Sequence, residues 1–257
     1  MKELFKNKTV LVTGGTKGIG LACVKAFSGM GAKVYGTYLW GDNLDQLEQD
    51  FSSHICPPTF IQADASDERQ SEALITSISQ EFRSIDILIS NVAFAPQFKE
   101  TYQYRELEAS IQHNAWPLIT YLELIKKAFS HHPKHVVALT SEGHRSCHLD
   151  RYDYVAASKA VLESLVKYIS AREEIIVNCI SPGVVDTEAF DLVFGKNAQA
   201  FLKKHDPDFV IPAEDVANVA VALCSGLMDA VRGQIIKVDK GKMFTDTFLK
   251  WFNALDT

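Results

Sequence analysis

The sequence predicts an α/β fold: one doubly wound, Rossmann-type domain with a seven-stranded parallel sheet flanked by helices. Two observations predict it. Strand-like and helix-like segments alternate along the whole chain of 257 residues, and a glycine-rich loop joins the first strand-like segment to the first helix-like one. No linker, repeat or low-complexity tract interrupts this alternation. We therefore expect a single domain over residues 1–257.

Short apolar, β-branched runs mark the expected strands. They are Thr9–Val12, Lys33–Tyr38, Thr59–Gln62, Ile85–Ser90, His135–Thr140, Ile175–Ile180 and Gln234–Val238. Helical periodicity predicts helices between them, among which are Ile19–Phe27, Asp67–Phe82, Glu106–Phe129 and Tyr154–Arg172. Because these runs are largely apolar, both faces of the sheet should be covered by helices.

Two further segments do not fit this alternation. Between Asp186 and Pro212, aromatic and charged residues mix without a strand pattern, and we expect an insertion that could close over a ligand. The C-terminal extension, residues 244–257, carries apolar residues at i, i+4, i+7 and i+8 from Phe244 onward, which predicts an amphipathic helix. We expect it to form an oligomer contact or a wall of the substrate pocket, because it carries little positive charge for a membrane surface.

Composition excludes several classes of function. The formal net charge of −6 and a pI near 5.8 argue against nucleic acid as the main partner. No signal-peptide pattern opens the chain and no long apolar run crosses it, so we expect a cytoplasmic protein without membrane contact. The five cysteines are scattered and lack CxxC spacing, which predicts neither disulfides nor a metal site.

The glycine-rich loop Thr13–Gly20, with sequence TGGTKGIG, is the first candidate site. A loop of this kind between a first strand and a first helix can bring backbone N–H groups and the helix dipole onto a pyrophosphate. The alternative is a tight turn without a ligand. Its position between strand and helix favours nucleotide binding.

This loop resembles the glycine motif of the short-chain dehydrogenase/reductase family. Four further segments match that family in order over nearly the whole chain, namely Asp64, the segment SNVA (residues 90–93), Asn114 and the segment NCISPGVVDT (residues 178–187). The resemblance implies an oxidoreductase with a nicotinamide dinucleotide cofactor. One departure is Ala93, which stands where the family has the glycine of NNAG.

The resemblance also assigns cofactor contacts. Asp64 would bond the adenine, although as an alternative it could cap a helix; the Val184 backbone would bond the nicotinamide carboxamide, and Thr187 the pyrophosphate or amide. The full predicted set is Gly14, Thr16, Lys17, Gly18, Ile19, Gly20, Thr37, Asp64, Ala65, Asn91, Val92, Ala93, Lys159, Pro182, Gly183, Val184 and Thr187.

The second strand indicates which nucleotide is bound. An acid at its end would accept a hydrogen bond from the ribose 2′-OH of NAD and repel the 2′-phosphate of NADP. Thr37 stands where that acid would be, and in the resembling family a base at the position of Lys17 commonly meets the 2′-phosphate. We therefore expect NADP(H), with a solvated loop lysine as the alternative for Lys17.

The catalytic motif departs from the common family pattern YxxxK. Lys159 matches the lysine, but Val155 stands four residues before it. On a helix, Tyr152 lies within about 20° of the Lys159 direction, whereas Tyr154 lies about 140° away. This geometry selects Tyr152, although a bulge in the first helical turn could bring Tyr154 back to the lysine face.

The spacing of Tyr152 and Lys159 resembles the enoyl-acyl-carrier-protein reductase branch of the family. That resemblance implies reduction of a C=C bond conjugated to a thioester, with Tyr152 donating to the enolate oxygen and Lys159 holding the ribose. Ser141 matches the family's substrate-binding serine, but it lies 18 residues before Lys159 where the common gap is 17. The resemblance implies that Asn114 orders a water leading to Lys159, and Pro117 would leave a carbonyl beside it free to hold that water. The alternative is a plain kinked helix.

Two alternatives stay open. One is a ketone or alcohol oxidoreductase that uses Tyr154, and the other is a nucleotide-sensing protein that has lost chemistry. For the preferred interpretation we expect an acyl thioester substrate, on coenzyme A or an acyl carrier protein, in fatty acid or secondary metabolism. By resemblance alone we expect a homotetramer or homodimer.

Overall fold

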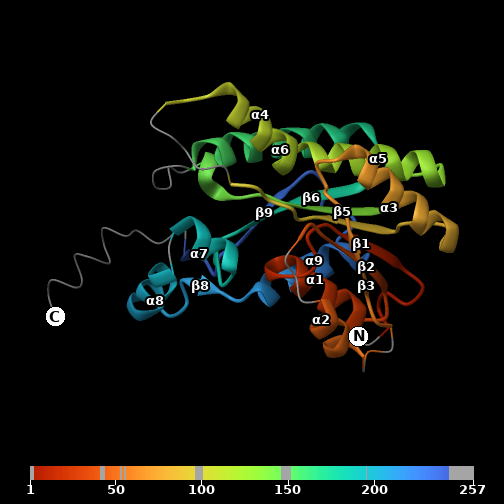
Figure 1. The fold of residues 1–257 in the computed structure, drawn as a ribbon, viewed down its shortest axis with the longest axis horizontal. Coiled ribbons are helices and arrows are strands. Elements are labelled where there is room, and N and C mark those ends of the chain that lie inside the picture. The colour runs from red at the N-terminus through yellow and green to blue at the C-terminus, as the bar shows by residue number, and fades with distance from the viewer. Residues whose placement is uncertain are drawn as a thin grey trace, which may run out of the picture.

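The computed structural model describes residues 3–40, 44–52, 54, 56–95, 101–145, 152–194 and 196–242. They form a seven-stranded sheet in the order β3-β2-β1-β4-β5-β6-β9, in which every pairing is parallel (Figure 1). The strands are β1 (Thr9–Val12), β2 (Lys33–Tyr38), β3 (Thr59–Gln62), β4 (Ile87–Ser90), β5 (His135–Leu139), β6 (Ile176–Pro182) and β9 (Ile235–Val238). The strand order reverses between β1 and β4, the point where open α/β sheets bind ligands.

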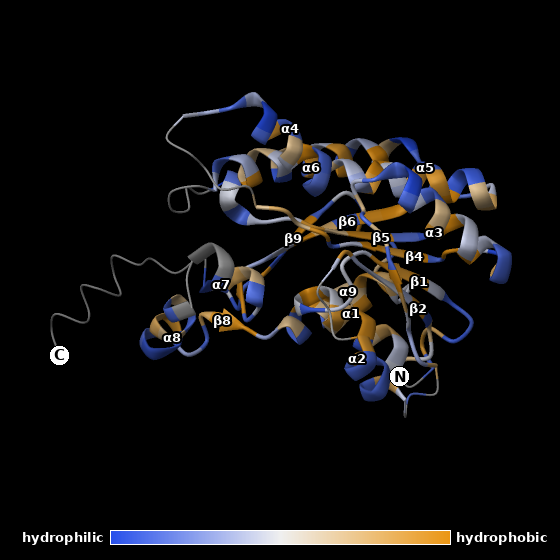
Figure 2. Cartoon of the chain, in the orientation of Figure 1, coloured by the Kyte–Doolittle hydropathy of each residue, from blue (hydrophilic) through white to orange (hydrophobic). Residues whose placement is uncertain are grey.

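Helices cover both faces of this sheet (Figure 1). One layer holds α1 (Gly18–Gly29), α2 (Leu44–Phe51) and α9 (Ala213–Cys224), and the opposite layer holds α3 (Glu68–Glu81), α4 (Tyr104–Asn114), α5 (Trp116–Phe129) and α6 (Asp153–Arg172). Alternate strand residues face the two layers: Val10 and Val12 pack with α1 and α9, while Leu11 packs with α3 and α5. The strands are accordingly largely apolar, as the orange segments of the sheet in Figure 2 show.

The predicted fold class and all seven predicted strands are confirmed. Three strands have the predicted boundaries and the other four differ by one or two residues at one or both ends. The predicted helix over 106–129 is two helices, because the chain departs from helical geometry at Ala115, with φ −124° and ψ −47°. Pro117 lies in the first turn of α5, where its missing N–H costs no helical hydrogen bond.

The segment between Asp186 and Pro212 contains two short helices, α7 (Glu188–Phe194) and α8 (Lys196–His205). They are bracketed by the two-residue strands β7 (Val184–Val185) and β8 (Val210–Ile211), which pair with each other. In Figure 1, α7 and α8 lie to one side of the main helical layers. That this insertion closes over a ligand stays a prediction. The predicted C-terminal helix lies outside the described residues.

Candidate active site

The glycine loop has the backbone that a phosphate cradle needs. Gly14 and Gly18 adopt positive φ values of 66° and 54°, which side-chain-bearing residues rarely adopt. At Gly20 a Cβ would lie 1.9 Å from the Gly14 carbonyl oxygen, so only glycine fits. The N-cap residue of α1, Lys17, makes no capping hydrogen bond through its side chain. The first amides of α1 can therefore bind an anion.

Two neighbouring strands brace this loop. The Asn91 side-chain amide donates to the Thr13 carbonyl at 3.0 Å and to the Gly14 carbonyl at 3.2 Å. The Thr37 hydroxyl accepts a hydrogen bond from the Gly14 N–H at 3.0 Å and is fully buried. Thr37 was expected among the cofactor contacts; its side chain instead holds the loop, and no acid stands in its place at the end of β2.

Asp64 occupies the turn after β3. Its Oδ1 accepts hydrogen bonds from the backbone N–H and the hydroxyl of Ser66, at 2.8 and 2.7 Å. The alternative that Asp64 caps α3 is wrong, because the N-cap is Asp67, whose carboxylate accepts from the Arg69 and Gln70 amides. Ala65 beside it is buried. This arrangement leaves Asp64 available to an adenine.

The remaining predicted cofactor residues gather at the carboxyl edge of the sheet. Val92 and Ala93 follow β4, whereas Thr16 and Ile19 belong to the glycine loop and the start of α1. Thr187 approaches Gly18, since a Cβ on that glycine would lie 3.2 Å from the Thr187 Cγ2.

The predicted cofactor residues after β6 lie in one short segment. Pro182 is the last residue of β6, and Val184 is the first residue of β7. Between them, Gly183 donates its N–H to the Val238 carbonyl. The fold brings these predicted contacts to one edge.

The two candidate tyrosines lie in different environments. Tyr154 is only 5% exposed, and its hydroxyl accepts a hydrogen bond from the Gln103 N–H at 2.7 Å, on the side of α4. Tyr152 is the N-cap residue of α6, which begins at Asp153. Its ring lies on the backbone of Gly143, where a Cβ would come within 2.5 Å of the ring carbons Cδ1 and Cε1.

Tyr152 and Ser141 form the polar end of the site. Burial raises the pKa of Tyr152 above its ordinary value, and the Ser141 side chain opposes that rise. Among the described residues, the Ser141 hydroxyl has no partner at regular hydrogen-bond geometry, although it is buried. A buried hydroxyl in that condition can bind a substrate oxygen. The phenol is protonated at neutral pH and can donate.

Lys159 is 4% exposed, and its ammonium donates to the Leu139 carbonyl oxygen at 2.7 Å. Burial lowers the pKa of Lys159 from 10.5 to about 8, against the raising effects of Cys179 and Glu163. A lysine in this state can gain or lose a proton near neutral pH. Lys159 belongs to α6, and because Leu139 is the last residue of β5, this contact places the ammonium at the carboxyl edge of the sheet.

Asn114 connects α4 to α6 and to the segment after β4. Its Nδ2 donates to the Phe94 carbonyl at 2.8 Å and to the hydroxyls of Ser110 and Ser158 at 3.0 Å, and its Oδ1 accepts from the Phe94 N–H at 2.6 Å. The predicted break beside Asn114 is present. These contacts fix the loop after β4; the predicted water path to Lys159 stays a prediction.

Sequence reasoning missed three charged residues beside this site. Glu142 and Glu163 are buried, and Arg145 bridges them. A signal was available for Glu142, since it stands seventeen residues before Lys159, at the spacing where the common family pattern has serine. No comparable signal pointed to Glu163, because its partners come from other elements.

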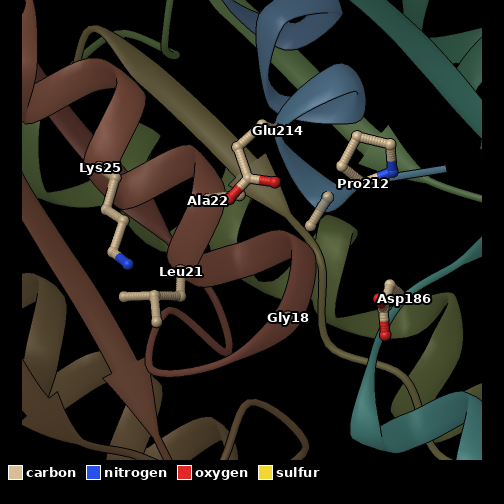
Figure 3. Close-up of a pocket in the computed structure, with 8 residues that line it drawn as sticks. Gly18, Leu21, Ala22, Lys25, Asp186, Pro212 and Glu214 are labelled. Carbon is tan, nitrogen blue, oxygen red and sulfur yellow. The ribbon is translucent and has the colours of Figure 1, made fainter.

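A cavity of about 290 Å³ lies beside the glycine loop, between α1 and the start of α9 (Figure 3). It is lined by Gly18, Leu21, Ala22, Lys25, Asp186, Pro212, Ala213 and Glu214. It does not include Tyr152 or Lys159. Its lining is mainly acidic or apolar and its volume is at the lower limit for ligand pockets, so we place the chemistry at the edge of β4, β5 and β6 instead.

The described part of the chain contains no group of three or more His, Cys, Asp or Glu side chains that could hold a metal ion. It also contains no helix long and apolar enough to cross a membrane.

Comparison with known proteins identifies the family to which this chain belongs. A family model described as enoyl-(acyl carrier protein) reductase matches residues 14–243. The chain belongs to the short-chain dehydrogenase/reductase family, a family of oxidoreductases.

Individual relatives differ in their chemistry. The enoyl-acyl-carrier-protein reductase (NADH) FabI from Rickettsia prowazekii is 28% identical over 253 residues, which are 93% of this chain and 95% of the relative. The 3alpha-hydroxysteroid dehydrogenase from Mediterraneibacter gnavus is 27% identical over 248 residues, 93% of this chain and 98% of the relative. A short chain dehydrogenase from Burkholderia cenocepacia, solved in complex with NADP, has the same fold, with a TM-score of 0.78 at 23% identity over 91% of this chain and 97% of that one.

Proposed function

We propose that the protein reduces the carbon–carbon double bond of an enoyl thioester with NADPH. The observation that carries this proposal is the environment of the two tyrosines. The Tyr154 hydroxyl already accepts the Gln103 N–H, whereas Tyr152 lies beside Ser141 on the turn after β5. A donor two helical turns before Lys159 suits an oxygen that lies far from the hydride acceptor.

The bound nicotinamide would supply a hydride to the β-carbon of the substrate. Tyr152 would then donate a hydrogen bond, and finally its proton, to the thioester enolate oxygen. The Lys159 ammonium would bond the ribose hydroxyls and favour the phenolate of Tyr152 by its charge. Ser141 would assist at the same oxygen, and Asn114 would support resupply of the proton to Lys159.

The preference for NADPH is part of the proposal. Lys17 is exposed at the start of α1, and the end of β2 holds Thr37 in place of an acid. Similar proteins include one named for NADH and one solved with NADP, so the nucleotide must be measured directly. We expect NADPH to bind at least about tenfold more tightly than NADH, a difference of about 1.4 kcal/mol. In a fluorescence titration, Lys17→Ala should weaken NADPH alone; equal affinities in the wild type would contradict the preference.

The oligomeric state and the carrier of the substrate are proposed by analogy with the family. We propose a homotetramer or homodimer, and a substrate carried by coenzyme A or an acyl carrier protein.

A second function is favoured by a specific observation. A relative of comparable identity is a 3alpha-hydroxysteroid dehydrogenase, and a ketone or alcohol oxidoreductase would be its counterpart here. If Tyr154 were its donor, the phenol would have to leave the Gln103 N–H and rotate from the α4 side toward Lys159. That rearrangement would give up a part-buried hydrogen bond, which costs about 1 kcal/mol.

The experiment that tests the proposed function compares two substrates on the purified protein. NADPH oxidation is measured with crotonyl-coenzyme A and with acetoacetyl-coenzyme A. Faster turnover of the crotonyl thioester supports enoyl reduction. Turnover of the acetoacetyl thioester alone would replace it with ketone reduction, and binding of NADPH without any turnover would favour a nucleotide-sensing protein.

A further inference from the structure

Two buried carboxylates lie beneath the turn that follows β5. Glu142, in the 3-10 turn η1 (Glu142–His144), is 6% exposed, and Glu163, on α6, is 4% exposed. Burying an unpaired carboxylate costs several kcal/mol, so such groups persist only with charged or hydrogen-bonding partners. Burial alone would raise the pKa of Glu142, but Lys237, Ser181 and Arg145 outweigh it and hold that pKa below its ordinary value.

Arg145 joins the two carboxylates. One terminal nitrogen of its guanidinium donates to Glu142 Oε1, and the other donates to Glu163 Oε2. The planar guanidinium presents several donors in a fixed arrangement, which a lysine ammonium cannot reproduce. Arg145 therefore ties the turn after β5 to helix α6.

Further hydrogen bonds hold each carboxylate. Glu163 accepts from the Thr140 hydroxyl at 2.8 Å and lies 3.0 Å from His144 Nε2. Glu142 accepts from the Ser181 hydroxyl at 2.8 Å and pairs with the Lys237 ammonium at 2.9 Å. The turn is thus attached to α6 on one side and to β6 and β9 on the other.

The same turn contacts the residues proposed to bind the substrate oxygen. Ser141 lies between the two attached residues Thr140 and Glu142, and the Tyr152 ring rests on Gly143. On α6, Lys159 lies one helical turn before Glu163, so both side chains project from the same face of the helix. Because the Tyr152 ring rests on Gly143, a shift of the turn would move that ring, while the backbone of α6 would keep Lys159 in place.

We propose that Glu163 is a positioning residue: through Arg145 and Thr140 it holds the turn on which the Tyr152 ring rests. It does not touch the substrate in this account. The proposal rests on the proposed function only in taking Tyr152 as the proton donor, and its test includes a measurement that needs no turnover.

The test variant is Glu163→Gln, which keeps the shape and an acceptor for Thr140 but removes the charge that holds Arg145. Its matched control is Glu173→Gln, immediately after the same helix, where the carboxylate pairs with Lys126 at 3.6 Å and His132 at 3.4 Å. We expect Glu163→Gln to lower kcat for crotonyl-coenzyme A by about tenfold or more, with the NADPH Kd changed by less than about threefold. Glu173→Gln should change neither.

Arg145 supplies a second pair of variants. Arg145→Met removes the bridge, and we expect a loss of kcat similar to that of Glu163→Gln. Arg145→Lys restores one charge contact, so its kcat should lie between those of Arg145→Met and the wild type. Wild-type kcat in folded Glu163→Gln and Arg145→Met would overturn the positioning role, whatever the change in Tm.

A spectroscopic measurement keeps the proposal testable if the wild type reduces neither thioester and the proposed function fails. With ¹³C at the tyrosine Cζ, the Tyr152 resonance is assigned by its loss in Tyr152→Phe. We expect this resonance to move in Glu163→Gln and Arg145→Met, and to stay in place in Glu173→Gln. If the Tyr152 resonance stays in place in both Glu163→Gln and Arg145→Met, the proposal is overturned, whatever the substrate.

Discussion

At the scale of single residues, burial sets the protonation states on which the chemistry depends. Tyr152 is held protonated because burial disfavours its phenolate, and Lys159 titrates near neutrality because burial disfavours its ammonium. The two residues are therefore a phenol that can donate a proton and an amine that can exchange one. Both protonation states depend on the low-dielectric surroundings that burial gives these groups.

The lowered pKa of Lys159 predicts a pH dependence of stability. The folded-state pKa of about 8 lies below the unfolded value of 10.5, so the unfolded state binds more protons between these values and wild-type stability rises with pH across that window. The penalty for burying the charged amine, on the order of 3 kcal/mol, is fully present below pH 8 and disappears by about pH 10.5.

Lys159→Met has no amine to titrate. Relative to wild type, its free energy of unfolding should therefore be higher at about pH 7 than at about pH 10. Urea unfolding of both proteins at the two pH values measures the difference. If the two free energies of unfolding change in parallel with pH, Lys159 does not carry the lowered pKa.

The choice of Tyr152 over Tyr154 rests on helical periodicity, because Tyr154 and Lys159 lie on one helix and Tyr152 is its N-cap residue; it stays a prediction. The partners of Glu142 and Glu163 could not be found this way. Apart from the Arg145–Glu142 contact, which spans three positions, the hydrogen bonds from Thr140, Arg145 and Ser181 join residues 18 to 39 positions apart. Such contacts depend on tertiary packing, which no local pattern encodes.

At the scale of elements, the strands were predictable because buried parallel strands are apolar throughout and the glycine loop fixes the first one. The helix over 106–129 was predicted as a single element because its apolar periodicity continues through Ala115. The break arises from Pro117 together with the contacts of Asn114 to Phe94, and the second of these is invisible in the sequence. Predicted strand ends differ because terminal residues depend on pairing.

A substitution in the turn η1 tests the position of the Tyr152 ring. Gly143→Ala adds a methyl group where the Tyr152 ring lies 2.5 Å away, so the ring must move from its seat. We expect kcat to fall by about tenfold or more, while NADPH affinity in a fluorescence titration stays near the wild-type value.

The control for this substitution is Gly29→Ala at the end of α1, where an added Cβ meets nothing within 4 Å. It should leave kcat unchanged. A fully active Gly143→Ala enzyme would show that the position of the Tyr152 ring does not limit turnover.

At the scale of the whole molecule, the sheet joins the glycine loop on one half to the Tyr152 and Lys159 end on the other, across the reversal of strand order between β1 and β4. A dinucleotide laid along this edge would contact only the folded state. Its binding must therefore raise the stability of the fold.

This linkage gives a prediction for the intact protein. NADPH at about a hundred times its Kd should stabilise the fold by about 2.7 kcal/mol, which raises Tm by roughly 5–10 °C for a chain of this size. Gly20→Ala should lose this increase, because its methyl group would collide with the Gly14 carbonyl. A folded Gly20→Ala protein with the full wild-type shift in differential scanning fluorimetry would place the nucleotide elsewhere.

The proposed proton donor is Tyr152, and NADPH oxidation with crotonyl-coenzyme A by Tyr152→Phe and by Tyr154→Phe decides between the two tyrosines. Loss of a positioned donor typically costs about 10²- to 10⁴-fold in rate. We predict that loss for Tyr152→Phe with NADPH affinity intact, and turnover close to the wild type for Tyr154→Phe, whose hydroxyl bonds Gln103. An inactive Tyr154→Phe beside an active Tyr152→Phe would contradict the account.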